Sequence, residues 1–563
     1  AVMDALSDRG SIPRASTADD GPGTRSGRRR VSATRRPDRM RRRLALALVG
    51  LAAALPLTAL DAQAGNGRLR GAMQAWRRAN EAALVRELAE FAAIPNVARD
   101  TVALARNADW LVRAFEREGF TMRRLEGQGG PPAVVGELRV PGAARTIVLY
   151  AHYDGQPVDP AQWRSDPWTP ELRSERGEVI PLATLVGPVA PEARLFGRST
   201  SDDKGPIVAV LGALRALRAA GARPSVNVRV FFDGEEEVGS PHLRAVLETH
   251  AATLAGGDAW LFLDGPVHQS RRMQLLFGAR GALGLELTTY GPITAVHSGH
   301  YGNWAPNPAL AIAEIVSSFR TADGTIRIAG FLDDVPPPSA TDRRALAALP
   351  PIDSSLRRAL ALGWTEAEGS PLAERLLLPA INVRGLRSGG IRGQAANVIP
   401  TIAGASIDFR LVPNQTPARV QAQVEAHLRA RGWTVVHEAP DSAMRARIPR
   451  LVRVEWGAGN AAVRTPLDAP IARALVDAIT SVTGVPPLEV PTLGGSLPLA
   501  PITDVLRVPV VIVPTVNHDN AQHAPDENLR LANLFDAVDL FAGLLLDLDR
   551  HWGPGGRRSG GRD

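Results

Sequence analysis

The chain has 563 residues, no cysteine and a formal net charge of +7. This length exceeds what one compact core usually holds, so we expect at least two domains. Without cysteine the chain can form neither disulfides nor thiolate metal sites, and any metal would be held by histidines and carboxylates. Residues 1–43 contain twelve arginines and five aspartates, which account for the whole +7. The rest is neutral overall, so no nucleic-acid partner is expected.

The N-terminal part contains two kinds of sequence. Residues 1–39 lack apolar periodicity and are expected to be disordered or to lie upstream of the true translation start. Residues 40–64 combine a basic stretch, the apolar run LALALVGLAAALPLTAL and the small-residue site AQA, which is typical of a secretory signal peptide. Cleavage after Ala64 would place the protein in the periplasm or outside the cell, with no stable membrane span.

Two alternatives remain for the N-terminal part. An uncleaved membrane anchor is one, because the apolar run is only slightly shorter than a membrane span. An arginine-rich arm that binds nucleic acid is the other, and it predicts salt-dependent DNA binding by the full chain. The signal-like segment argues against such an arm.

Helices and strands are expected to alternate over residues 65–277. The spacing of apolar residues predicts helices over 69–93, 102–118, 204–220 and 242–255, and strands over 133–140, 146–150, 226–232 and 259–263. This alternation predicts an α/β fold with a central, mostly parallel sheet that helices cover on both faces.

The pattern changes after residue 277. Strands over 281–290 and 403–411 and helices over 308–319 and 418–431 predict a smaller α+β sandwich domain, inserted over 278–458. The first domain then resumes over 459–550 with a helix at 470–482, a strand at 508–514 and a helix at 531–548. Residues 551–563 are expected to be a disordered tail. The proline-rich segment 335–351 is expected to be a local elaboration that alters specificity.

Acids and histidines follow several of the predicted apolar strands. They are His152 and Asp154 in an H-x-D pattern, Asp202 and Asp203 before a helix, the triplet Glu235, Glu236 and Glu237, Asp264, and His523 in a late polar loop. Taken singly, each has an ordinary structural explanation, such as a helix cap or a solvated loop. Together they would meet along one edge of the sheet, where α/β proteins bind ligands. Two histidines with carboxylates and no sulfur are the ligand set of a two-metal hydrolytic site.

The chain resembles a known family on the segments HYDGQP with its downstream WRSDPW, GRSTSDDKGP, GEEEVGS and QHAPDEN. These motifs are similar to those of the dizinc metallopeptidases that include carboxypeptidase G, aminoacylase, acetylornithine deacetylase and carnosine dipeptidase. The resemblance covers about residues 69–548, and an aspartate at position 264 fits the dipeptidase-like branch. It implies a zinc-peptidase catalytic domain with an inserted lid and dimerisation domain.

The resemblance assigns roles to the site residues by position. It makes His152, Asp202, Glu237, Asp264 and His523 the metal ligands, with Asp202 as the bridge between the two ions. Glu236 is then the general base, and Asp154 steadies His152. The resemblance also implies a cis peptide between Asp202 and Asp203. Glu235 has no role and is expected to tolerate substitution.

The inserted domain and a late loop carry the implied substrate-binding residues. His297 would reach the substrate carbonyl, in many relatives across a dimer interface. Asn397 and Arg410 would bind substrate, Arg410 being suited to a carboxylate. Gly495 and Ser496 would belong to a glycine loop that lets the substrate backbone approach closely. The alternatives are an exposed loop histidine for His297 and an outward-facing strand residue for Arg410.

The signal-like segment and the resemblance together imply an exported hydrolase. The resemblance implies two Zn²⁺ per chain, which Mn²⁺ or Co²⁺ could replace. The hydrolase would cleave the amide bond of dipeptides or N-acyl amino acids that carry a free carboxylate, and it could form a homodimer through the inserted domain. Carboxypeptidase or deacylase activity is the alternative within the family. A secreted binding protein that has lost catalysis is a further alternative, but no ligand position is missing.

Overall fold

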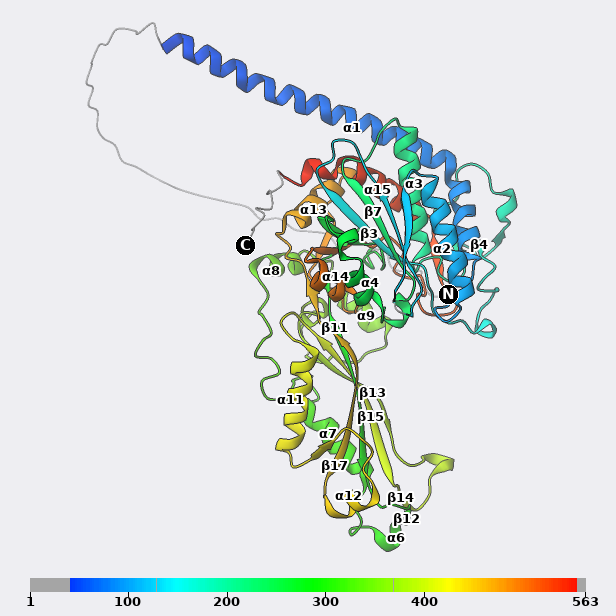
Figure 1. Cartoon of the computed structure of the whole chain (residues 1–563), viewed down its shortest axis with the longest axis vertical. Helices are drawn as coiled ribbons and strands as arrows, with labels where there is room; N and C mark the ends of the chain where they lie inside the picture. Colours follow the sequence, from blue (N-terminus) through cyan, green and yellow to red (C-terminus); the bar gives the residue numbers. More distant parts are fainter. Residues whose placement is uncertain (1–40, 128, 368, 554–563) are drawn as a thin grey trace, which may run out of the picture. The chain divides into compact units, whose positions relative to one another are not determined.

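The computed structural model describes residues 41–127, 129–367 and 369–553, and only the backbone of residues 41–65. The chain divides into two units, Ala1–Gly65 and Asn66–Asp563. Helix α1 (Arg41–Ala92) begins in the first unit and ends in the second (Figure 1). The helix predicted to begin at residue 69 therefore begins earlier.

The predicted disorder of residues 1–39 lies outside the described residues. Within the described ranges, no helix combines the length and apolar character needed to cross a membrane.

The second unit contains an eight-stranded mixed sheet in the order β1-β2-β7-β3-β8-β20-β9-β19. Its strands are β1 (Thr121–Leu125), β2 (Ala133–Leu138), β3 (Thr146–His152), β7 (Asn227–Asp233), β8 (Ala259–Phe262), β9 (Gln274–Leu276), β19 (Leu488–Val490) and β20 (Val510–Ile512). Strands β7, β3, β8 and β20 are parallel neighbours, whereas β1, β2 and β9 pair antiparallel with their inner neighbours. The carboxyl ends of the four central strands therefore lie at one edge.

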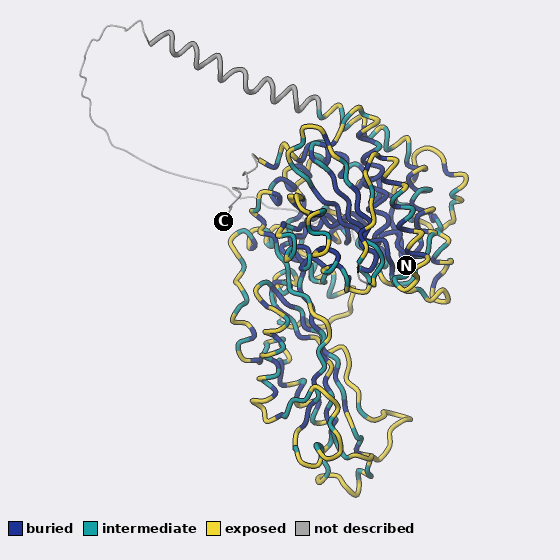
Figure 2. Tube along the Cα trace, in the orientation of Figure 1, coloured by how far each residue is buried: buried dark blue, intermediate teal, exposed yellow. Residues whose placement is uncertain are grey.

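Helices cover both faces of this sheet, as the α/β prediction requires. Along β3, Ile147 and Leu149 belong to one buried cluster and Val148 and Tyr150 to another, because successive side chains point to opposite faces. The first cluster includes residues of α1, α2 (Thr101–Glu116), α3 (Lys204–Ala219), α13 (Pro470–Thr483) and α15 (Leu531–His551). The second includes residues of α4 (Leu243–Thr249), α5 (Ala251–Leu254) and α14 (Leu499–Leu506). Figure 2 shows the strands buried between these layers.

The C-terminal tail was predicted to begin too early. Helix α15 continues to His551, and Trp552 is only 5% exposed. The guanidinium of Arg145 lies 4.7 Å from the centre of the Trp552 ring, so the tryptophan packs as part of the domain. Residues 554–563 lie outside the described ranges.

A four-stranded antiparallel sheet lies beside the main one and joins distant segments. It consists of β5 (Val179–Ile180), β4 (Glu171–Arg173), β6 (Arg194–Phe196) and β21 (Asn528–Arg530). Pairing of β6 with β21 brings the loop after β6, which leads to Asp202, next to the loop before β21, which holds His523. These strands have two or three residues each, too few for a pattern to reveal them in the sequence.

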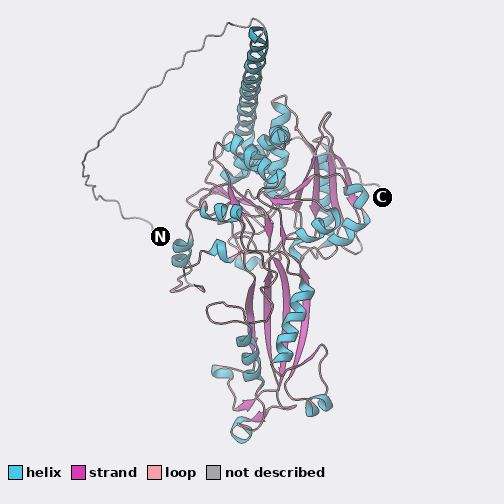
Figure 3. Cartoon of the chain, turned by 90° about the vertical axis from the view of Figure 1, so that its left-hand side faces the viewer, coloured by secondary structure: helices cyan, strands magenta, loops and turns pink. Residues whose placement is uncertain are grey.

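The inserted segment forms a five-stranded sheet in the order β13-β15-β11-β17-β16 (Figure 3). Its strands are β13 (Ala380–Arg387), β15 (Ile402–Leu411), β11 (Gly281–Tyr290), β17 (Leu451–Asn460) and β16 (Thr434–Val436). Helices α7 (Pro308–Phe319) and α11 (Pro417–Ala430) bury one face of it, against the alternate residues of β11 and β15. Strand β17 extends two residues beyond the predicted domain boundary at 458.

Shorter elements complete the fold. They are β10 (Gly278–Ala279), β12 (Val296–His297), β14 (Val398–Ile399), β18 (Val463–Arg464), α6 (Ser298–Tyr301), α8 (Ala340–Ala347), α9 (Asp353–Ala359), α10 (Leu372–Arg375), α12 (Ser442–Arg447), and the 3-10 turns η1 (Pro160–Gln162), η2 (Leu182–Thr184), η3 (Glu236–Val238) and η4 (Arg392–Gln394).

Lys204, the first residue of α3, ties this helix to the end of α1. Its Nζ donates to the carbonyl oxygens of Phe91 (2.9 Å) and Ile94 (2.7 Å) and lies 4.6 Å from the centre of the Phe91 ring. The side chain is fully buried, and burial lowers the pKa of its ammonium well below the usual value.

We expect Lys204→Met to lower the free energy of unfolding by about 1–3 kcal/mol, because two buried carbonyls would lose their donor. Urea denaturation of the metal-free protein would measure the change. The exposed Arg176→Met serves as a control. If Lys204→Met were as stable as the wild type or more stable, the free-energy cost of burying the ammonium would equal or exceed the stabilisation from its hydrogen bonds.

Candidate metal centre

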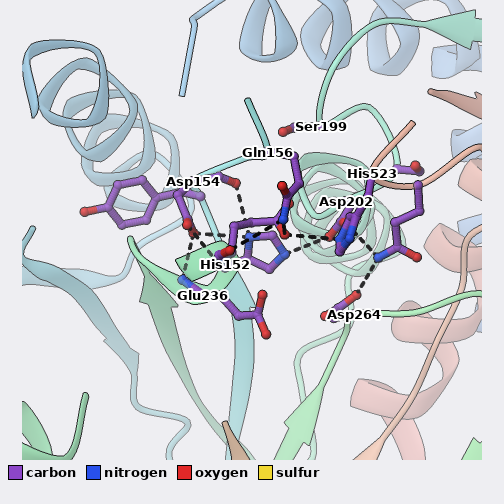
Figure 4. A network of polar contacts seen from close by, with 12 residues as sticks. His152, Asp154, Gln156, Ser199, Asp202, Glu236, Asp264 and His523 are labelled. Atoms are coloured by element: carbon purple, nitrogen blue, oxygen red, sulfur yellow. Dashed lines mark hydrogen bonds and ion pairs between the residues drawn. The ribbon is translucent and has the colours of Figure 1, made fainter. Parts of the chain in front are cut away.

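Three neighbouring parallel strands end in the residues predicted to form the site. His152 is the last residue of β3, Glu236 and Glu237 lie in η3 just after β7, and Asp264 follows β8. The strand order β7-β3-β8 places these ends side by side (Figure 4). Asp202 lies just before a helix, as predicted, in the loop between β6 and α3 and not at the end of a strand in this sheet.

Asp202 lies between two histidines. Its Oδ1 is 2.8 Å from Nε2 of His152, and its Oδ2 is 3.1 Å from Nε2 of His523. One further carboxylate accompanies each histidine, Asp264 beside His152 and Glu237 beside His523. In each group of three, all candidate ligand atoms lie within 4.8 Å of one another. The five residues thus form two potential metal sites that share Asp202.

Asp154 holds both sides of this arrangement in place. Nδ1 of His152 lies 3.2 Å from the backbone carbonyl oxygen of Asp154 and 3.3 Å from its Oδ1, which leaves Nε2 of that ring facing Asp202. The two carboxylate oxygens of Asp154 accept the backbone N–H groups of Glu236 and Glu237, each at 3.0 Å. A single buried residue therefore orients a histidine ring and fixes the turn that carries two glutamates.

The three glutamates of the triplet point in different directions. The carboxyl group of Glu236 points toward the space between His152 and Asp264 (Figure 4). The Glu237 carboxylate accepts from Nε2 of Gln156 (2.8 Å) and lies 3.1 Å from Nε2 of His523. The turn closes at Gly239, whose φ of 87° favours glycine.

Glu235 is not the dispensable residue that the sequence suggested. Its carboxylate is buried and accepts from the backbone N–H of His242 (2.7 Å) and lies 2.9 Å from Nδ1 of the same residue. Glu235 thus anchors the start of α4 to the turn after β7, and its removal would leave the half-buried donors of His242 without this acceptor.

The cluster has an excess of buried negative charge. Burial, followed by the neighbouring Asp202, raises the pKa of Asp264 to about 7, and burial raises the pKa of Glu236 well above its usual value. Hydrogen bonding to Asp202 and then to Glu237 raises the pKa of His523 to about 10. The acids therefore require positive charge nearby, and the imidazole and carboxylate donors suit divalent zinc, manganese or cobalt. The residues present fit a two-metal site.

Glu527 supports the centre but was given no role from the sequence. Its buried carboxylate accepts the backbone N–H groups of Ser199 (3.0 Å), Ser201 (3.0 Å) and Asp202 (3.1 Å) and pairs with Arg198 at 2.8 Å. The loop that it holds contains the expected cis peptide between Asp202 and Asp203. Glu527 lies in the QHAPDEN segment, four residues after His523. Its place in that motif was the only sequence feature that could have indicated a role at the metal centre.

We expect Glu527→Ala to lower the free energy of unfolding by about 3–5 kcal/mol, because Arg198 would be left buried without its counter-charge. Metal affinity should also fall by about 10- to 100-fold, since the Asp202 loop loses its support. Chemical denaturation and chelator competition would measure the two effects. The solvent-facing Glu175→Ala provides the comparison. Wild-type metal affinity in Glu527→Ala would contradict the supporting role.

A cleft of about 670 Å³ opens beside the cluster. It is lined by Gln156, Glu236, Glu237, Asp264, Gln522 and His523, by Ala282 and Asn460 of the inserted segment, and by Leu493, Ser496 and Leu497. Arg410 reaches its edge, where Nη1 donates to Oγ of Ser496 (3.0 Å) while Nε donates to Asp408 (2.8 Å). Arg410 and Ser496 are thus brought to the cleft, and Gly495 adjoins it.

His297 and Asn397 lie elsewhere in the inserted segment. They are exposed on and beside the small β12–β14 ladder, where Nδ1 of His297 accepts the N–H of Gly299 (3.1 Å). Neither is among the residues described as lining the cleft. That His297 reaches a site in a second subunit stays a prediction.

The comparisons with known proteins identify the family. Residues 148–547 match the description "Peptidase family M20/M25/M40". The chain belongs to this family. It is therefore a metallopeptidase, and the predicted family and fold are confirmed.

Two individual relatives agree with the dipeptidase-like branch, and a carboxypeptidase of solved structure is similar as well. The Cys-Gly metallodipeptidase dug1 of Schizosaccharomyces pombe is 24% identical over 474 residues, covering 81% of this chain and 94% of that protein. The Beta-Ala-His dipeptidase of Rattus norvegicus is 24% identical over 436 residues, covering 75% and 80%. The crystal structure of the M20 family metallo-carboxypeptidase Sso-CP2 from Sulfolobus solfataricus has a TM-score of 0.69 and 26% identity, covering 83% of this chain and 99% of that one.

Proposed function

We propose that this metallopeptidase is a two-metal dipeptidase that hydrolyses the amide bond of dipeptides with a free carboxylate. The observation that carries the proposal is the position of Asp202, with one oxygen toward each of two histidines. His152 and Asp264 would hold one ion, His523 and Glu237 the other, and Asp202 would bridge them. Zinc is the ion that the family resemblance favours, although the same ligands suit manganese or cobalt.

Glu236 is the general base in this proposal. When bound, the two ions would lower the pKa of a water molecule and polarise the scissile carbonyl. Glu236 belongs to neither group of three ligands, and its carboxyl group points into the space beside them. It would take the proton of the attacking water and deliver it to the leaving amine.

Arg410 and Ser496 would hold the substrate's carboxylate. Both lie at the cleft edge, and the planar guanidinium matches a carboxylate with two parallel hydrogen bonds. The names of the dipeptidase relatives favour dipeptides. Carboxypeptidase action is the second candidate, supported by the likeness to Sso-CP2, and deacylation of N-acyl amino acids is the third.

Export and dimer formation belong to the same proposal. The signal-like segment 40–64 supports export, and the boundary between the two units at Gly65 falls one residue after the predicted cleavage site. N-terminal sequencing of the protein recovered from its native compartment would test this. Leu386 and Ile391, exposed near the free edge of β13, support a homodimer through the inserted domain, which sedimentation would test.

Metal analysis combined with a substrate screen tests the proposed function. We expect two metal ions per chain and faster hydrolysis of dipeptides than of N-acyl amino acids. Fewer than two ions with all ligands intact would contradict the two-metal site. Preference for N-acyl amino acids would make the protein a deacylase, and ligand binding without hydrolysis would support the inactive binding protein.

A further inference from the structure

Two glutamines of the cleft lie against the candidate metal ligands and have no part in the proposed mechanism. Gln156 follows β3 in the HYDGQP segment, and Gln522 precedes His523 in the late polar loop. Both line the cleft of about 670 Å³, and both are partly exposed. Their side chains are therefore within reach of a substrate bound in the cleft.

The acceptors around each glutamine fix the orientation of its carboxamide group. Nε2 of Gln156 donates to Oε2 of Glu237 (2.8 Å) and lies 3.4 Å from the backbone carbonyl oxygen of the same residue. Nε2 of Gln522 donates to Oδ2 of Asp202 (2.7 Å) and lies 3.5 Å from Oδ1 of Asp264. A flipped carboxamide would bring two acceptor oxygens together, so in both residues the nitrogen faces the ligand. A ligand carboxylate can accept such a bond and still hold a metal ion.

The carboxamide oxygens of the two glutamines have no protein donor. Among the described residues, none donates to Oε1 of Gln156 or Gln522, and neither atom is buried without a partner, so both oxygens are open to solvent. Asn460 is the remaining carboxamide of the cleft lining, and its Oδ1 already accepts the backbone N–H of Ala282 (2.8 Å). The two glutamines thus supply the free carboxamide acceptors of the cleft.

The charges of the cleft permit a cationic group on the substrate. The residues described as lining it include no lysine or arginine. Two divalent ions would balance the four carboxylates of the centre, which are Asp202, Glu236, Glu237 and Asp264. In the proposed function three of these acids bind ions and Glu236 takes the proton of the water. A substrate cation therefore needs neutral acceptors, and an unpaired carboxamide oxygen with two lone pairs is one.

The covalent structure of a dipeptide places its amino group beside the metal ligands. Only the α-carbon separates the ammonium nitrogen from the scissile carbonyl carbon. When that carbonyl lies at the ions, the ammonium must lie close to their ligands, where Gln156 contacts Glu237 and Gln522 contacts Asp202. An ammonium has three N–H donors and can bond to both glutamine oxygens at once.

We propose that the carboxamide oxygens of Gln156 and Gln522 bind the α-ammonium group of the substrate. The protein would then select peptides with a free amino terminus and discriminate against N-acyl amino acids, which cannot make this contact. The inference rests on the proposed two-metal function, because it takes the scissile carbonyl to lie at the ions.

Hydrolysis of Ala-Phe and of propanoyl-phenylalanine by the metal-loaded full chain tests the proposal, because these substrates differ only in the amino group. At neutral pH we expect kcat/KM for Ala-Phe to be about 100-fold higher, since each hydrogen bond to a charged group contributes about tenfold. Gln156→Met and Gln522→Met should each lower this ratio by about tenfold. Gln162→Met is the matched control, because the exposed Gln162 also donates from Nε2 to a carboxylate, that of Asp159 (2.9 Å), but lies outside the cleft lining.

The ratio of the two kcat/KM values separates substrate binding from mere support of the metal ligands. A glutamine that only positions Glu237 or Asp202 would slow both reactions equally when replaced, and an unchanged ratio in both variants would overturn the proposal. Equal kcat/KM values of the wild type for Ala-Phe and propanoyl-phenylalanine would overturn it as well.

Calorimetry on the Zn²⁺-loaded Glu236→Gln variant separates this inference from the proposed function, because slow turnover lets both compounds be titrated intact. We expect Ala-Phe to bind at least about tenfold more tightly than propanoyl-phenylalanine, and Gln156→Met in this background to remove most of the difference. Equal affinities would overturn the ammonium site whether or not the wild type is active. Tighter binding of Ala-Phe, with no hydrolysis of either compound by the wild type, would overturn only the proposed function.

Discussion

Replacing Glu236 by glutamine is expected to lower kcat by about 10²- to 10⁴-fold, the usual contribution of a positioned general acid–base group. Glutamine has nearly the same shape, and the backbone N–H of residue 236 would still donate to Asp154, so the turn should keep its geometry. Because Glu236 belongs to neither group of three ligands, the metal content should stay at the wild-type value. Steady-state kinetics together with metal analysis on one preparation would measure both.

The control for this experiment is Glu248→Gln, on the exposed side of α4, which removes the same charge away from the cleft. It should leave kcat unchanged. Wild-type turnover in Glu236→Gln would remove Glu236 from the role of base. Loss of metal in that variant would instead place Glu236 among the ligands.

Replacing Asp202 by alanine is expected to prevent tight binding of both metal ions. Each of its carboxylate oxygens faces a different histidine, so the substitution removes a ligand from both sites. We expect affinity for both ions to fall by more than about 100-fold, which is the upper range for residues that merely support a ligand. Chelator competition would measure the affinities, and the metal-dependent rise in Tm should disappear with them.

His523→Ala provides the contrast, because His523 belongs to only one of the two groups. It should weaken binding of one ion and leave the other in place. Equal effects of the two substitutions on both ions would contradict the bridging position of Asp202. If Asp202→Ala still bound two ions tightly, Asp202 could not be the ligand that bridges them.

The core of the site was predictable because its strands are long and apolar. The runs that became β3, β7 and β8 are visible in the sequence, and parallel strands that follow one another bring their carboxyl ends together. His152, Glu237 and Asp264 could therefore be placed near one another before the structure was known. Asp202 was placed among them mainly by its motif, because the strands that bring it there, β6 and β21, pair across more than three hundred residues and have three residues each.

Residues that act through buried hydrogen bonds were also missed. Glu235 and Glu527 are acids in polar segments, where solvent exposure is the ordinary expectation. Three backbone N–H groups converge on Glu527, and the backbone N–H and ring of His242 face Glu235. Loop geometry sets these contacts, and composition does not. The role of Lys204 became clear for the same reason, once the carbonyls of Phe91 and Ile94 were seen at its ammonium.

The contacts of Asp154 limit how this enzyme could be altered. One carboxylate faces His152 and holds the backbone of Glu236 and Glu237, so a ligand of each proposed ion and the proposed base depend on the same side chain. A substitution at Asp154 that is meant to alter one of these three residues would therefore disturb the other two. New substrate preferences are therefore more accessible through the cleft walls, which can vary while the reaction chemistry stays fixed.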